Sequence, residues 1–89
     1  MKITFIGSGY VGLVSSVMMS HLGHSVTCLD IDKVKINQLK NLKLPIFEDG
    51  LEGYLTKYGN TNRLNFVCGY DNTIYESEAI FIAVGTPQG

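Results

Sequence analysis

The sequence has little charge and no excess of either sign. Lys and Arg together number 7, Asp and Glu 8, so the formal net charge is -1 and only 17% of residues are charged. A basic field that would attract nucleic acid or anionic lipid is therefore missing. No apolar run approaches the roughly 20 residues that cross a bilayer, and the N-terminus has no signal-peptide pattern. These absences predict no nucleic-acid partner, no membrane partner and a cytoplasmic location.

Cysteine is also scarce. Cys28 and Cys68 are the 2 cysteines, and they lie far apart without the spacing of a metal site. In a cytosolic chain they should stay reduced and act as small apolar residues on neighbouring strands. The sequence therefore predicts no metal centre. With 89 residues, the chain is long enough for one small domain at most.

The glycines between Gly7 and Gly12 are the most informative feature that is present. They follow an apolar run at 3–6 and precede another at 13–19. In this strand, turn and helix context, a G-x-G-x-x-G pattern predicts a dinucleotide site. Gly7 allows a tight turn, Gly9 lets a pyrophosphate approach the backbone, and Gly12 lets the helix pack closely on the strand. A strand-to-helix turn without a ligand can have the same pattern, so the motif needs support from elsewhere.

The remainder of the chain alternates apolar runs with helical patterns. The expected strands are residues 2–6, 25–29, 64–68 and 79–84, and the expected helices are 11–22, 33–42 and 48–58, with one turn in 72–78. This alternation favours parallel strands joined by right-handed crossovers. We therefore predict an α/β chain with a partial Rossmann (doubly wound) fold. Its parallel sheet would have about four strands in the order 3-2-1-4, with flanking helices.

Asp30 ends the second expected strand, about 20 residues after the glycine turn. A carboxylate there can accept hydrogen bonds from both ribose hydroxyls of an adenosine and would repel a ribose phosphate, which favours NAD over NADP. The alternative is a helix-capping aspartate. Asp32 already suits the N-cap of the next helix, which would leave Asp30 for the ligand.

Two further polar residues are weaker candidates. Lys35 lies one helical turn after Asp30, where its ammonium could reach the ribose, although the residues alone favour a solvated lysine. Thr86 follows the fourth expected strand, across the crevice from the glycine turn, where ligands bind in such sheets. It could contact the nicotinamide half of the cofactor, or it could belong to a turn set by Gly85 and Pro87.

Several blocks of the sequence, in order and over the whole chain, resemble the UDP-glucose/GDP-mannose dehydrogenase family. The Gly-Tyr-Val-Gly form of the turn and the Val-Gly-Thr-Pro ending are the most specific of these blocks. The blocks are residues 1–4, 6–14, 22–24, 29–32, 35–36, 44–48, 50–51, 63–64 and 81–87.

This resemblance implies a cofactor, a reaction and an assembly. It implies two successive NAD-dependent oxidations of a nucleotide sugar's C6 alcohol to the carboxylate, through a thiohemiacetal and a thioester on a cysteine. Neither Cys28 nor Cys68 occupies that nucleophile position, so no catalytic residue is assigned. A homodimer is implied for the full-length enzyme. The implied NAD contacts are Tyr10, Val11, Asp30, Lys35 and Thr86.

The resemblance is to the N-terminal part of an NAD-binding domain, so we expect the chain to be inactive by itself. The family's central and UDP-binding domains have no counterpart in residues 1–89. One alternative is a non-catalytic remnant or a small nucleotide-binding module that pairs with another chain. Another is a different nucleotide-sugar dehydrogenase, of the GDP-mannose or UDP-N-acetylmannosamine type. The blocks at 45–51 and 85–87 count against other Rossmann oxidoreductases.

Overall fold

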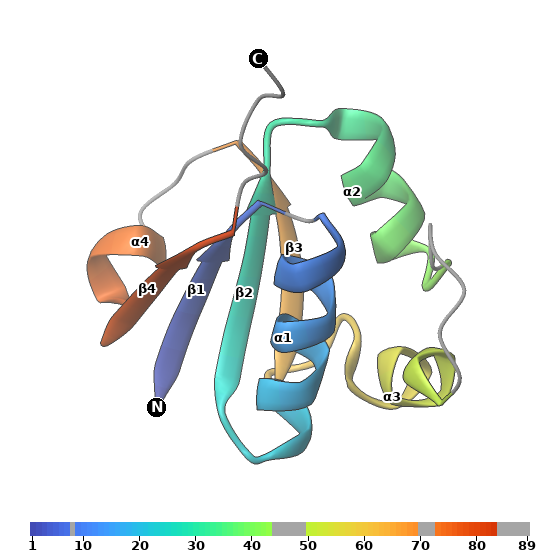
Figure 1. Ribbon diagram of the computed structural model, residues 1–89, viewed down its shortest axis with the longest axis horizontal. Helices are drawn as coiled ribbons and strands as arrows, with labels where there is room; N and C mark the ends of the chain where they lie inside the picture. The colour runs from blue at the N-terminus through green and yellow to red at the C-terminus, as the bar shows by residue number, and fades with distance from the viewer. Residues whose placement is uncertain (8, 44–49, 70–72, 84–89) are drawn as a thin grey trace.

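Four parallel strands form one sheet in the order β3-β2-β1-β4 (Figure 1). The computed structural model describes residues 1–7, 9–43, 50–69 and 73–83, and for Tyr10 and Thr73 the backbone only. The strands are β1 (Lys2–Ile6), β2 (Ser25–Asp30), β3 (Leu64–Cys68) and β4 (Ala79–Ile82). The helices are α1 (Tyr10–His21), α2 (Lys33–Lys40), α3 (Leu51–Tyr58) and α4 (Thr73–Glu76). The predicted fold class and strand order are confirmed.

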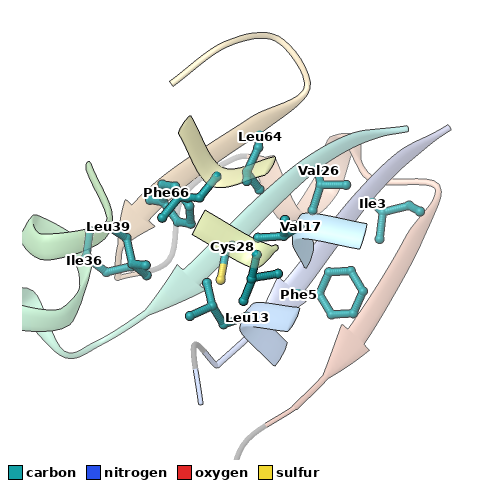
Figure 2. Packing of buried hydrophobic residues seen from close by; sticks show 12 residues of the cluster. Ile3, Phe5, Leu13, Val17, Val26, Cys28, Ile36, Leu39, Leu64 and Phe66 are labelled. Atoms are coloured by element: carbon teal, nitrogen blue, oxygen red, sulfur yellow. The ribbon is translucent and has the colours of Figure 1, made fainter. Parts of the chain in front are cut away.

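The core lies between one face of the sheet and the helices α1, α2 and α3. Successive strand residues point to opposite faces, and on the first three strands alternate apolar side chains are buried toward these helices. Figure 2 shows this cluster, with the helix residues inserted over the strands. Its members are Ile3, Phe5, Leu13, Val17, Val26, Cys28, Ile36, Leu39, Leu51, Leu55, Leu64 and Phe66.

The opposite face of the sheet carries much less cover. Thr4 lies between two core residues of β1 and points to this face. Its hydroxyl forms a hydrogen bond with the hydroxyl of Ser77, just after α4. A cavity of about 470 Å³ lies beside this contact, with Lys2, Ser25 and Thr27 among its lining residues. Lys2 and Ser25 lie at the amino ends of β1 and β2.

Helix α1 ends close to the predicted position. Its C-cap is Leu22, and Gly23 follows with φ +106°, a left-handed conformation that glycine adopts without strain. Helix α2 ends at Lys40, two residues before the predicted end at Leu42, because Leu42 takes φ +60° and turns the chain away from the helix axis.

Helix α3 begins at Leu51 after Gly50, which has φ +84°. Among the described residues, the predicted helix over 48–58 therefore starts at Leu51 and does not include Gly50. Residues 48 and 49 lie outside the described residues. The predicted strand at 79–84 ends at Ile82, before Ala83, and residue 84 lies outside the described residues.

Backbone hydrogen bonds continue past the carboxyl ends of the strands. The amide of Gly7 donates to Leu29 O at 2.7 Å, and that of Gly69 donates to Asp30 O at 2.8 Å. On the other side, the amide of Ala83 donates to Ile6 O at 2.8 Å. The four strand ends are thus joined into one continuous rim, where ligands of parallel α/β sheets bind.

Strand β4 forms an edge of the sheet and is largely uncovered. Ile80, Phe81 and Ile82 are 44%, 47% and 72% exposed. Phe81 stacks on Phe5 of the neighbouring strand, with ring centroids 5.1 Å apart. Among the residues that the structure describes, no helix is both long and apolar enough to cross a membrane.

Candidate dinucleotide-binding site

The turn from β1 to α1 leads into a helix whose N-cap residue, Gly9, has no side chain that could form a capping bond. Gly9 is the N-cap, with φ -67° and ψ -177°, and makes no side-chain capping bond. Its carbonyl accepts the amide of Leu13 at 2.8 Å, which begins the helical ladder. The first turn contains no acidic residue. The partial positive charge of this helix end therefore remains to be matched by an anion such as a pyrophosphate.

Two of the glycines have opposite surroundings. A Cβ atom on Gly9 would meet no other atom within 4 Å, so the space above the turn is open to a ligand. A Cβ atom on Gly12 would overlap the carbonyl oxygen of Gly7 and lie 3.0 Å from Ala83 Cβ. Gly9 leaves room outside the protein, whereas Gly12 allows α1 to pack closely against the strand ends.

Asp30 lies at the tip of β2 and is half-buried. Its Oδ1 accepts the backbone amide of Asp32 at 2.9 Å. Asp32 in turn accepts the amides of Val34 and Lys35 at 3.0 and 3.2 Å, which confirms it as the N-cap of α2. Asp30 therefore also orders the turn that Asp32 caps, and its contact with a ligand stays a prediction. A carboxylate has about four lone-pair sites, so ribose hydroxyls can add to this bond.

Cys68 lies beside Asp30, a proximity that the sequence argument did not identify. The two residues are direct partners in the register of β2 and β3, so their side chains share a face of the sheet. Cys68 is exposed, and its Sγ donates to Ile31 O at 3.8 Å. Ile31 itself is 77% exposed. The parallel pairing of the two strands was the signal that could have placed these residues together.

The structure describes some of the remaining candidate residues fully, one by its backbone only, and one not at all. Val11 is exposed on the first turn of α1, beside Tyr10, whose backbone begins the helix. Lys35 is half-buried in the first turn of α2. Thr86 lies outside the described residues. Within the described ranges, His, Cys, Asp and Glu side chains form no group of three that could hold a metal ion.

Comparison with known proteins identifies the family. A family model described as "UDP-glucose/GDP-mannose dehydrogenase family, NAD binding domain" matches residues 1–89. The chain belongs to the UDP-glucose/GDP-mannose dehydrogenase family. The matched domain is the family's NAD-binding domain, so NAD is the dinucleotide for this site. The open space at Gly9, the uncapped helix start and the carboxylate at the tip of β2 fit that cofactor.

Relatives in the UDP-glucose/GDP-mannose dehydrogenase family share about half of the residues. A UDP-glucose 6-dehydrogenase of Rickettsia felis is 58% identical over 87 residues, which is 98% of this chain and 19% of the relative. One of Bacillus subtilis is 51% identical over 88 residues, 99% of this chain and 20% of the relative. The chain thus spans about a fifth of the length of these family members.

Solved structures of the family share the fold. A GDP-mannose dehydrogenase of Pseudomonas aeruginosa, solved as a ternary complex, matches with a TM-score of 0.91 and 37% identity, covering 100% of this chain and 20% of that one. A UDP-glucose dehydrogenase of Pyrobaculum islandicum matches with a TM-score of 0.86 and 33% identity, covering 99% and 20%.

Proposed function

We propose that residues 1–89 are the N-terminal part of the NAD-binding domain of a UDP-glucose 6-dehydrogenase, and that they bind the adenosine and pyrophosphate half of NAD. The observation that supports this most strongly is the open, uncapped helix start at Gly9, on the same rim as the carboxylate of Asp30. The helix start at Gly9 suits a pyrophosphate, and the Asp30 carboxylate suits a ribose diol.

Each candidate residue has a proposed role in that site. Gly9 leaves room for the pyrophosphate, and the backbone at Tyr10 and Val11 donates to it, as the uncapped first turn of α1 supports. Asp30 accepts the ribose hydroxyls, with Lys35 nearby on α2. Thr86 contacts the nicotinamide half. The full proposed set is Gly7, Gly9, Tyr10, Val11, Gly12, Asp30, Lys35 and Thr86.

The reaction is proposed for a longer enzyme that contains these residues. UDP-glucose, two NAD and water would give UDP-glucuronate and two NADH, with NAD accepting the hydrides. The names of the relatives support this substrate. The residues described above bind and orient the cofactor, and none is assigned a catalytic role. We further propose that the longer enzyme is a homodimer and that the 89-residue chain alone is inactive.

Calorimetric titration of the 89-residue chain with NAD and with NADP tests the binding proposal directly. We expect NAD to bind and NADP to bind more weakly, because the Asp30 carboxylate repels the 2′-phosphate. The Asp30→Asn variant has a similar shape but no charge, so it should reduce the preference for NAD over NADP. A folded chain that shows no heat with NAD would overturn the proposal. Appearance of NADH with UDP-glucose would refute the proposed inactivity.

A second candidate function has support from β4. Its exposed apolar residues form a sheet edge, which is a ready template for pairing with another polypeptide. The chain would then be a nucleotide-binding module that joins a partner through this edge. Sedimentation velocity over a range of concentrations distinguishes the two ideas, because a chain that stays monomeric throughout gives no support to edge pairing.

A further inference from the structure

Two buried polar side chains lie beneath the glycine turn. Ser16 on α1 and Cys28 on β2 are both 0% exposed. The Ser16 hydroxyl donates to Gly12 O at 2.6 Å. The Cys28 thiol donates to Gly7 O, with a sulfur to oxygen distance of 4.0 Å, which is long and therefore weak. The two contacted carbonyls belong to the first and last glycines of the motif.

Two backbone hydrogen bonds already restrict part of this turn, because the amide of Gly7 donates to Leu29 O and that of Leu13 to Gly9 O. Gly7 has φ +106°, and glycine loses more conformational freedom on folding than any other residue. A Cβ atom on Gly9 would meet no other atom within 4 Å, so that side of the turn is open. Among the described residues, Cys28 and Ser16 contact the Gly7 and Gly12 carbonyls from below.

The thiol remains a donor under ordinary conditions. Burial raises the pKa of Cys28 to about 11, the Ser16 hydrogen bond opposes this rise, and the charge of Asp30 adds to it. At neutral pH the sulfur is therefore protonated and keeps its S–H group.

We propose that Ser16 and Cys28 are positioning residues for the NAD site, which hold the Gly7 and Gly12 carbonyls from the protein interior and so fix the turn that receives the pyrophosphate. This inference rests on the proposed function of the turn. It assigns to the two side chains no contact with the cofactor, because both are fully buried.

Ser20 offers a matched control on the same helix. It is also 0% exposed, and its hydroxyl donates to Ser16 O at 2.7 Å, the same type of bond one helical turn further from the glycines. It also donates to Arg63 O at 3.1 Å, at the opposite end of the sheet. Ser20→Ala therefore removes comparable buried hydrogen bonds without touching the turn.

The experiment compares Ser16→Ala, Cys28→Ala and Ser20→Ala by NAD titration and by amide hydrogen exchange. We expect the first two to weaken NAD binding about three- to tenfold, the effect of losing one modest hydrogen bond. They should also speed exchange at the amides of Gly7 and Leu13, which are bonded across the turn. Ser20→Ala should leave both measurements as in the wild type. Cys28→Ser provides a second variant if Cys28→Ala does not fold.

The inference would be overturned if Ser16→Ala and Cys28→Ala kept the wild-type affinity for NAD and the wild-type rate of amide exchange. It would also be overturned if Ser20→Ala changed both measurements as much as these two variants do. The exchange measurement needs no cofactor. If the wild-type chain failed to bind NAD, the proposed function would fall, while exchange at Gly7 and Leu13 would still decide whether the two side chains hold the turn.

Discussion

The carbonyl oxygen of Gly7 occupies the place that a Cβ atom on Gly12 would need. Gly12→Ala should therefore push α1 away from the strand ends, at a cost of about 1–3 kcal/mol in the free energy of unfolding, as for other overpacked sites. Urea denaturation measures this. An unchanged midpoint would show that α1 can shift without cost.

Gly9 should respond in the opposite way. Its φ of -67° suits any residue, and an added Cβ meets nothing within 4 Å, so Gly9→Val should keep the fold. The new side chain would fill the space proposed for the pyrophosphate and abolish NAD binding. Circular dichroism checks the fold and calorimetry the binding. Retained affinity in Gly9→Val would place the pyrophosphate elsewhere.

Asp30→Ala should weaken NAD binding by about 1–3 kcal/mol, because hydrogen bonds to a charged acceptor are lost. Asp32→Ala is the control. It removes the N-cap of α2 and should lower stability by about 1 kcal/mol, while the backbone amide that binds Asp30 remains. Equal NAD affinity in Asp30→Ala and the wild type would remove Asp30 from the site.

The proposed site predicts that bound NAD protects one thiol from chemical modification. Cys68 is exposed beside Asp30, whereas Cys28 is buried, so iodoacetamide should modify Cys68 alone in the folded chain. Bound NAD should slow that modification by covering the tip of β3. Mass spectrometry of the modified peptides gives both rates. An unchanged rate at Cys68 with NAD bound would mean that the adenosine does not reach this strand.

Stability should fall in alkali because of Cys28. Burial raises its pKa from the usual 9.0 to about 11, so between these values the unfolded chain loses a proton that the folded chain keeps. The free energy of unfolding therefore decreases as pH rises through this window, by up to roughly 2–3 kcal/mol. Urea midpoints below and above the window measure the loss. The Cys28→Val variant should lose less stability over this pH range than the wild type. An equal loss in the variant would mean that other groups cause the effect.

The strands could be predicted closely, because each is a short run rich in apolar residues. The C-terminal end of α2 and the start of α3 could not, since they depend on left-handed backbone at Leu42 and Gly50 rather than on the apolar pattern. Leu42 in particular is a residue type that gives no sign of such a turn.

The site divides in the same way. Gly9 and Asp30 are predicted from the motif and its spacing, and their contacts with the dinucleotide stay a prediction. The bond from the Asp32 amide to Asp30 and the place of Cys68 depend on local turn geometry and strand register. Ser16 gave no signal, because a serine that faces the sheet from within a helix looks like any small residue.

The bonds from Gly7 to Leu29 and from Gly69 to Asp30 join three strand ends through backbone atoms alone. The separation of the glycine turn from the tip of β2 is therefore set by backbone atoms, whichever side chains stand at positions 30 and 68. With NAD bound as proposed, exchanging those side chains would change which nucleotide is preferred without moving its two anchoring points. Cofactor preference would then be open to redesign without rebuilding the backbone.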